Sequence, residues 1–206
     1  MIFGKNCANC SARCSNSYFY NQGENMKKKF TAGFIPFAFS VLFAGCTTST
    51  ADLEAVRNFQ PEKYMGTWYE IARLPHYFER GMNQVSAEYS LNPDGSIRVV
   101  NRGKRNGEQK TIVGKAHLKK RNGKPLNGEL RVSFFGPFYS DYRIIELPED
   151  YSYSVVTGGS RNFLWILSRT PTLPDARLKP ILEKLRTLGF AVEKLEWNTR
   201  RRFLLP

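Results

Sequence analysis

The chain has few of the residues that cross-link, bind metals or catalyse. Of its four cysteines, Cys46 is the last, so a domain formed by the residues after it contains no disulfide and depends on packing. The 206 residues include only two histidines, His76 and His117. The sequence also lacks a Gly-x-Ser-x-Gly elbow and the His and Glu spacing of a metal site. We therefore expect no enzyme activity, no cofactor and no metal ion.

The sequence also lacks a hydrophobic run long enough to span a bilayer as a helix. The uncharged apolar stretch over residues 30–45 is shorter than the roughly 20 residues that a transmembrane helix needs. It follows a basic segment at residues 26–29 and ends in small residues directly before Cys46, which is typical of an export signal. An ordinary secreted signal or an uncleaved anchor would fit the same pattern. The pair Cys7 and Cys10 is half of a possible zinc site, but no second half follows.

Residues 42–46 resemble a bacterial lipobox, although Phe43 stands where leucine is usual. The resemblance implies that the signal is cut before Cys46 and that the Cys46 sulfur carries a diacylglyceryl group. The residue after Cys46 is Thr47 and not aspartate. By resemblance to the lipoprotein sorting rule, this implies an outer-membrane location. We expect residues 1–25 to be a misassigned upstream extension and residues 26–45 a signal peptide. Residues 46–58 would then be a flexible lipidated tether, and residues 59–206 one folded domain.

Acidic residues are outnumbered by basic ones. The chain has 31 Lys and Arg against 18 Asp and Glu, for a net charge of +13. Such an excess can indicate nucleic-acid binding, but an exported and anchored protein does not routinely meet nucleic acid. An anionic membrane surface or an anionic ligand is the partner that this charge favours.

Strand-like runs recur at about ten-residue intervals from Trp68 onwards. Turn signals such as Asn106-Gly107 and Asn122-Gly123 separate several of them. Eight antiparallel strands in simple order predict an all-β, up-and-down barrel, whose interior has room for one small ligand. The predicted strands cover residues 68–74, 84–91, 96–102, 110–119, 129–134, 138–147, 152–157 and 163–168.

Period-two alternation gives these strands one apolar face, which we assign to the barrel interior. The sixth strand is ambiguous, because Tyr139, Arg143 and Ile145 compete with Tyr142 and Ile144 for the inner face. The predicted ligand-contacting lining comprises Ala87, Tyr89, Val99, Ile112, Leu130, Val132 and Phe134.

After Pro171 the apolar period changes from that of a strand to that of a helix. We expect Asp175 to cap the start of this helix and Gly189 to end it. Because strand side chains fill the interior, the helix must pack outside the barrel. Its apolar stripe consists of Leu178, Ile181, Leu182, Leu185 and Leu188.

Two residues at opposite ends of the strand region indicate that the sheet closes. Trp68 follows Gly66 at the start of the first strand, and Arg169 comes directly after the last strand. The two side chains can stack only if the first and last strands meet. A contact of this cation–π type contributes roughly 0.5–2 kcal/mol.

With these elements the chain resembles a lipocalin, and most of all the bacterial lipoprotein and apolipoprotein D-like members of that family. The resemblance covers nearly all of residues 56–197. Gly66-x-Trp68 matches the first family motif and Arg169 the third. Residues 149–151 (Glu-Asp-Tyr) match the second motif, with glutamate where threonine is usual.

The resemblance implies a cup that Trp68 and Arg169 close at one end, with Tyr89, Tyr142 and Trp165 in its ligand pocket. It further implies binding of a fatty acid, a lysophospholipid or a similar amphiphile, for storage or transport in envelope maintenance. Loops at the open end carry more basic than acidic residues, which would suit an anionic head group. The basic candidates are His76, Arg80, Lys104, Arg105 and Arg161.

Two other functions stay open. Some relatives of this fold catalyse isomerisation or epoxide chemistry, and a filled, ligand-free barrel would make the protein purely structural. The apolar turn around Phe135 and Phe138 suits a membrane or a second copy of the chain equally well, so a homodimer is also possible.

Overall fold

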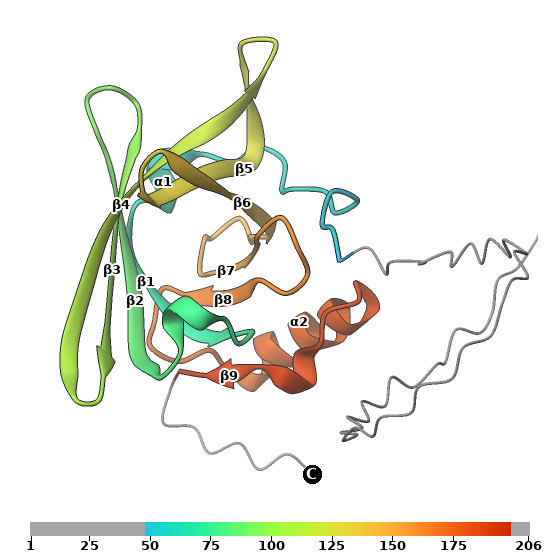
Figure 1. Cartoon of the computed structure of the whole chain (residues 1–206). Coiled ribbons are helices and arrows are strands. Elements are labelled where there is room, and N and C mark those ends of the chain that lie inside the picture. The colour runs from blue at the N-terminus through green and yellow to red at the C-terminus, as the bar shows by residue number, and fades with distance from the viewer. Residues whose placement is uncertain (1–47, 199–206) are drawn as a thin grey trace, which may run out of the picture. The chain divides into compact units, whose positions relative to one another are not determined.

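The computed structural model describes residues 48–198. The predicted start at Met26, the signal peptide and the acylated Cys46 lie outside the described residues. Within them, the strands follow one another as an up-and-down meander (Figure 1). The strands are β1 (Gly66–Arg73), β2 (Met82–Leu91), β3 (Ile97–Arg105), β4 (Glu108–Arg121), β5 (Lys124–Phe135), β6 (Phe138–Glu146), β7 (Tyr153–Thr157), β8 (Leu164–Ser168) and β9 (Glu196–Trp197).

The sheet closes on itself at β1. This strand pairs antiparallel with β2 on one side and with β8 on the other, so strands β1 to β8 form a closed antiparallel barrel. Two-residue turns join β3 to β4 and β4 to β5, and both residues of each turn have positive φ. Asn-Gly suits this turn type, because both residues tolerate the left-handed region. The predicted fold class is confirmed.

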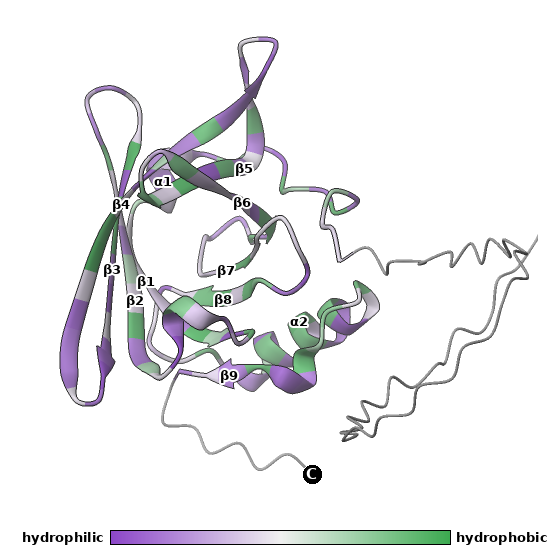
Figure 2. Cartoon of the chain, in the orientation of Figure 1, coloured by the Kyte–Doolittle hydropathy of each residue, from purple (hydrophilic) through white to green (hydrophobic). Residues whose placement is uncertain are grey.

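Apolar side chains fill the interior around Trp68. Hydrophobic and hydrophilic residues follow one another along the barrel strands (Figure 2), as the sequence pattern predicted. On β6, Ile144 belongs to the inner cluster and Tyr142 packs against it, while Arg143 pairs with Glu129. Leu130 on β5 lies opposite Tyr142, and this register resolves the ambiguity of the sixth strand.

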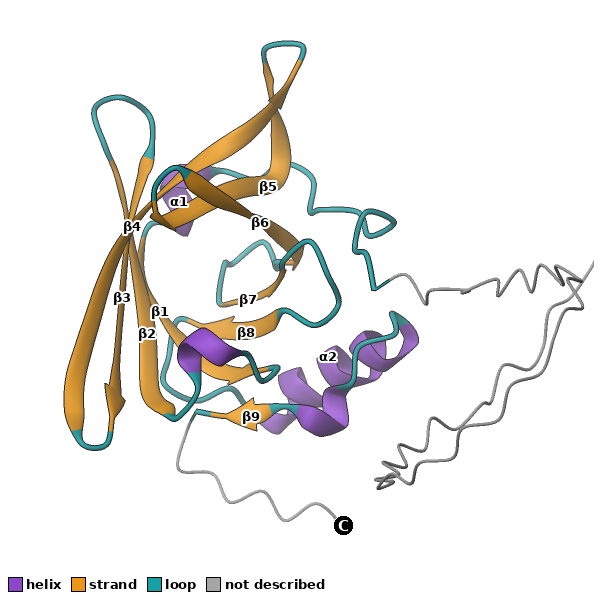
Figure 3. Ribbon diagram, in the orientation of Figure 1, coloured by secondary structure: helices purple, strands orange, loops and turns teal. Residues whose placement is uncertain are grey.

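The long helix α2 (Asp175–Thr187) packs on the outside of the barrel (Figure 3). Its buried residues Leu178, Ile181 and Leu185 share a second hydrophobic cluster with outward side chains of β1, β7 and β8. The helix thus covers the barrel wall and leaves the interior to the strands.

The two ends of α2 differ from the prediction in one respect. Pro174 is the N-cap residue and Asp175 lies in the first turn, so the expectation that Asp175 caps the helix is wrong. Its carboxylate still lies where the helix dipole favours negative charge. At the other end Gly189 has φ +82°, and its N–H donates to the Arg186 carbonyl at 3.0 Å, which ends the helix as predicted.

Residues 48–58, which we call the N-terminal strap, are fixed on the barrel surface. The Thr50 hydroxyl donates to the Gly158 carbonyl at 2.6 Å, and Thr50 is only 2% exposed. Leu53 is buried in the outer cluster, and the Val56 N–H donates to the Ile144 carbonyl at 2.9 Å. The expectation of a flexible tether is therefore wrong for these residues, because the barrel provides partners for their polar groups.

Candidate functional site

Trp68 closes one end of the barrel, which we call the base. The indole is fully buried, and its Nε1 donates to the Tyr64 carbonyl at 2.8 Å. The Arg169 guanidinium carbon lies 3.9 Å from the centroid of the indole ring. The guanidinium also donates to the carbonyls of Lys63 and Thr67, at 2.7 and 3.1 Å. Arg169 therefore joins the end of β8 to the start of β1 through both stacking and hydrogen bonds.

Gly66 is required at its position by its backbone conformation. Its φ is +92°, which side chains rarely adopt, and a Cβ there would lie 3.4 Å from a terminal nitrogen of Arg169. The glycine thus lets the chain turn into β1 directly beside the Arg169 guanidinium.

Three tyrosine hydroxyls meet inside the barrel near the base. Tyr64, the last residue of the short helix α1 (Pro61–Tyr64), packs beside Trp68 with ring centroids 4.6 Å apart. Its hydroxyl oxygen lies 2.8 Å from that of Tyr142, which lies 3.1 Å from that of Tyr89. The Tyr64 hydroxyl donates to Ser154 Oγ at 3.2 Å. The four hydroxyls form a continuous hydrogen-bonded chain.

The chain of hydroxyls has a direction, because each carries one proton. Tyr64 donates its proton to Ser154 and therefore accepts from Tyr142, which in turn accepts from Tyr89. Burial raises the pKa of Tyr64 to about 12 and also raises the pKa of Tyr89 and of Tyr142. All three keep their protons at neutral pH. The Tyr89 oxygen is left with lone pairs but no proton for a further partner.

The inner wall becomes more accessible away from the base. Ile97 and Ala116 are buried, whereas Ile112 is 36% exposed. The unbroken β3–β4 register pairs Ile97 with Ala116 and Asn101 with Ile112, which puts Ile112 on the same inner face. The interior is therefore reachable from the end opposite the base, which we call the mouth. Of the predicted lining residues, Ala87, Tyr89, Val99 and Leu130 are buried in the inner cluster, and Val132, Phe134, Tyr142 and Trp165 pack against it half-buried.

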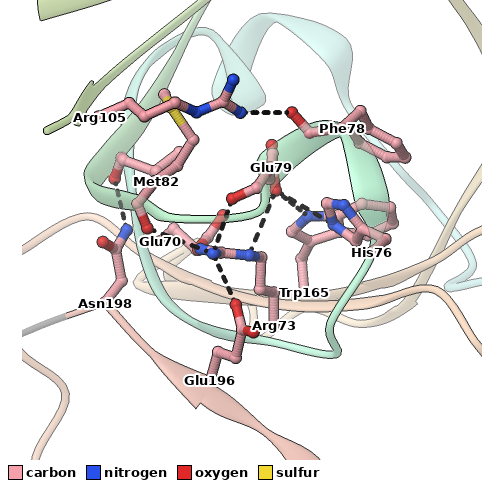
Figure 4. Close-up of polar contacts among 11 residues, drawn as sticks. Glu70, Arg73, His76, Phe78, Glu79, Met82, Arg105, Trp165, Glu196 and Asn198 are labelled. Atoms are coloured by element: carbon pink, nitrogen blue, oxygen red, sulfur yellow. Dashed lines mark hydrogen bonds and ion pairs between the residues drawn. The ribbon is translucent and has the colours of Figure 1, made fainter.

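A polar cluster lies along the wall beside Trp165, between β1 and the β1–β2 loop (Figure 4). At its centre, the buried Arg73 contacts the buried Glu70 at 2.6 Å and donates to Glu196 Oε2 at 2.7 Å. Arg73 also donates to the carbonyl of Glu79 at 3.0 Å. The Trp165 Nε1 donates to Glu79 Oε2 at 3.3 Å. One guanidinium thus ties β1 to the β1–β2 loop and to β9.

This cluster has more negative than positive groups. Burial, followed by the charge of Glu79, raises the pKa of Glu70 to about 8. The 2.6 Å contact with Arg73 favours ionised Glu70, but one guanidinium is shared among three carboxylates, the buried Glu70, Glu79 and the partly exposed Glu196. We conclude that Glu70 is the carboxylate that holds a proton, and that this part of the wall does not attract a further anion.

The predicted basic mouth residues are not equivalent. Arg105 lies on the inner face at the end of β3, where it donates to the Phe78 carbonyl at 3.1 Å and its buried Nε has no partner among residues 48–198. Arg161 is bound to the strap through Asp52 at 2.5 Å. The His76 ring stacks on Phe78 with centroids 3.9 Å apart. Arg105 is therefore the inward-facing mouth cation with hydrogen-bonding capacity left.

An open cleft of about 1190 Å³ lies outside the barrel, between the strap and the β4–β5 hairpin. Side chains of both charges line it, among them Arg57, Lys119 and Glu129. None of the predicted ligand-contacting residues lies there. The cleft is therefore separate from the site predicted inside the barrel.

Several residues of the interior were not predicted from the sequence, among them Tyr64, Glu70 and Arg73. Glu70 follows Trp68 by two positions, so strand parity alone would have placed it inside. Tyr64 lies in a short segment without a strand pattern, and no signal marked it. Within the described residues, no helix is long and apolar enough to cross a membrane, and no group of three His, Cys, Asp or Glu side chains is arranged to hold a metal ion.

An eight-stranded barrel with a Trp–Arg closure at its base and an apolar inner wall that opens at its mouth defines a ligand-binding β-barrel of the calyx type. Residues 59–200 match the model of the lipocalin-like domain. The chain belongs to the lipocalin family.

Similar proteins support this assignment. The outer membrane lipoprotein Blc of Citrobacter freundii is 45% identical over 163 residues, which cover 78% of this chain and 90% of that protein. Mouse apolipoprotein D is 33% identical over 147 residues, 67% of this chain and 75% of the relative. The bacterial relatives confirm the predicted outer-membrane location. Among solved structures, insecticyanin from the tobacco hornworm Manduca sexta shares the fold, with a TM-score of 0.61 at 20% identity over 73% of this chain and 86% of that one.

Proposed function

We propose that this lipoprotein binds one single-chain lipid inside its barrel, a fatty acid, a lysophospholipid or a similar amphiphile, for storage or transport in the cell envelope. The observation that carries the proposal is the inner wall, which is apolar and buried near the base but accessible at Ile112. Apolar walls with a few polar groups are typical of ligand pockets. Burial of an acyl tail against them contributes roughly 25 cal/mol per Å².

The hydroxyl chain at the base supports entry of the tail first. A carboxylate or phosphate needs hydrogen-bond donors, and the Tyr89 oxygen has none to offer. Near Trp165 the excess of carboxylates around Arg73 is equally unfavourable for an anionic head group. The head group therefore stays at the mouth and the tail points to the base.

Arg105 is the residue that we assign to the head group. Its guanidinium lies on the inner face of the mouth, where the buried Nε has no partner among residues 48–198. Charge-assisted hydrogen bonds of a guanidinium to a carboxylate or phosphate are among the stronger ones in proteins. For the tail we propose contacts with Ala87, Tyr89, Val99, Ile112, Leu130, Val132, Phe134, Tyr142 and Trp165.

The anchor in this proposal is Cys46, acylated after removal of residues 26–45. Each buried methylene of an acyl chain contributes roughly 0.8 kcal/mol, and more than one chain makes anchoring stable. Cys46→Ser should leave the protein soluble or uncleaved. Processed wild-type protein with a free thiol at Cys46 would contradict this part of the proposal.

Tryptophan fluorescence tests the ligand site directly. Titration of delipidated protein with palmitate or a lysophospholipid should change the emission, and Trp165→Phe should abolish most of that change. Trp197→Phe is the matched control and should leave the change intact, because Trp197 lies on β9 outside the barrel. Tyr142→Ala should weaken the affinity.

The head-group assignment has its own test. Arg105→Glu should weaken the binding of palmitate more than that of an uncharged monoacylglycerol, and the difference should shrink as salt is added. Saturable binding of no single-chain lipid would instead show that the barrel is filled and the protein structural. Turnover of a bound lipid by the purified protein would favour the enzyme alternative.

A further inference from the structure

The strap begins at the mouth of the barrel. The Arg161 N–H donates to the Thr48 carbonyl at 2.6 Å, and Ser49 forms a bridge with Ser160 in the β7–β8 loop. The Arg161 side chain holds this junction, because it donates to the Ser49 carbonyl and to Asp52, and also to the Leu188 carbonyl at the end of α2. The first described residues of the chain are thus attached to the tip of one mouth loop.

This attachment limits where the anchor lies. Cys46 is two residues before Thr48, and two residues of extended chain reach at most about 7 Å. Loops of an up-and-down barrel alternate between its ends, so the β7–β8 loop lies at the same end as the β1–β2, β3–β4 and β5–β6 loops. An acyl chain on Cys46, as proposed above, would therefore enter a bilayer beside the mouth, not beside the base.

Large exposed aromatic residues gather in two of these mouth loops. Tyr77 and Phe78 in the β1–β2 loop are 80% and 47% exposed. Phe135 and Phe138, which flank the β5–β6 turn, are 71% and 78% exposed. Tyrosine favours the interface between water and lipid, and phenylalanine favours the boundary between head groups and acyl chains.

Unpaired cations accompany these aromatic residues. Arg80 lies in the β1–β2 loop and Lys104 one residue before the end of β3. Among residues 48–198, neither has an ion-pair or hydrogen-bond partner from its side chain. A basic side chain near an anionic bilayer surface contributes roughly 1 kcal/mol.

We propose that the mouth end docks on the surface of the phospholipid bilayer that holds the anchor, through Tyr77, Phe78, Phe135 and Phe138, with Arg80 and Lys104 towards anionic head groups. The proposal rests on the acylated Cys46 of the proposed function. A bilayer fits this surface better than a second copy of the chain, since a two-fold interface would bring like charges together. The open end of the calyx would then face the membrane, from which a single-chain lipid can enter directly.

Position-specific quenching tests this orientation. The acylated full-length protein is reconstituted on phosphatidylcholine vesicles with phosphatidylglycerol, in which part of the phosphatidylcholine carries bromine on its acyl chains. Phe138→Trp should add emission that the brominated lipid quenches at least twofold. Leu91→Trp is the matched control and should not be quenched, since Leu91 is also exposed, at 43%, but lies at the base end of β2.

The outcomes separate the proposals. Brominated lipid inside the calyx would quench Trp165 equally in both variants and in the wild type, and this common signal is subtracted. If the protein does not bind the vesicles and stays in the supernatant, both the lipid anchor and the docking proposal are wrong. The Trp165 titration still tests lipid binding in the calyx independently. Equal quenching at positions 138 and 91, or none at 138 in vesicle-bound protein, overturns the docking. Tyr77→Trp repeats the test in the second loop in case Phe138→Trp disturbs the β5–β6 turn.

Discussion

Removal of the Trp68 indole should destabilise the barrel more than any change on its surface. Truncation of a fully buried tryptophan costs roughly 3–5 kcal/mol. In Trp68→Ala part of this cost comes from the loss of the indole N–H, which donates to the Tyr64 carbonyl at 2.8 Å. That carbonyl would be left buried without a hydrogen bond. Such an unsatisfied carbonyl alone accounts for about 1–3 kcal/mol.

The partner substitution, Arg169→Ala, should cost less. It removes the cation–π contact, about 0.5–2 kcal/mol, and two hydrogen bonds to backbone carbonyls from a half-buried guanidinium. We expect a loss of about 1–3 kcal/mol. In the double variant with Trp68→Ala, the two losses should fall short of additivity by about 0.5–2 kcal/mol, because the stacking can be lost only once.

Urea unfolding followed by far-ultraviolet circular dichroism measures these differences without relying on the removed fluorophore. Trp68→Phe separates the two contributions, because it keeps a ring beneath Arg169 but loses the donor to Tyr64. A Trp68→Ala protein within 1 kcal/mol of the wild type, or additive losses in the double variant, would refute the role of this contact in barrel closure.

The polar cluster and the strap give two further predictions. The pKa of Glu70 is raised in the folded state from an ordinary 4.5 to about 8, so its contribution to stability is complete below pH 4.5 and is lost as the pH rises through 8, by at most about 1.4 kcal/mol per pH unit. Glu70→Gln should remove this decline in the free energy of unfolding, measured by urea unfolding between pH 5 and 8.5. The control Glu54→Gln, at an exposed carboxylate, should keep the decline. If the stability of wild type and of Glu70→Gln changed with pH in parallel, Glu70 would not be the protonated carboxylate. Arg161→Ala should cost about 1–3 kcal/mol and speed proteolysis within residues 48–52, because three groups lose their donor. The control Arg57→Ala should change neither the stability nor the rate of proteolysis, because the ion pair of Arg57 with Glu54 is exposed. Equal proteolysis of the two variants would mean that Arg161 does not hold the strap.

The barrel was predictable because its determinants are local. Strand alternation, the Asn-Gly turns and the spacing between Gly66 and Trp68 can all be recognised within short windows of sequence. The Arg169 contact was predictable as well, since closure of an eight-stranded sheet brings its two ends together.

The strap was not predictable, because its stabilisation is not local. Leu53 is its one buried apolar side chain, and the polar groups of the strap bond to residues far along the chain. Thr50 donates to Gly158, 108 positions away, and Arg161 binds Asp52 across 109 positions. Without knowledge of these distant partners, a polar segment predicts a flexible tether. Arg73 was missed for the same reason, since Glu196 joins it only through the pairing of β9 with β1.

The direction of the hydroxyl chain at the base is set by a fully buried serine on the wall behind the tyrosines. Ser154 is fully buried on β7 and accepts a hydrogen bond from Tyr64. Tyr142 must therefore donate to Tyr64, and Tyr89 must donate to Tyr142. Without the serine hydroxyl the order can reverse, with Tyr64 donating to Tyr142 and Tyr142 to Tyr89. The Tyr89 proton would then point into the lumen, and the floor of the calyx would change from a hydrogen-bond acceptor into a donor. One buried oxygen on the far side of two tyrosines thus decides whether the deepest part of the cup can receive a ligand's hydroxyl or its carbonyl.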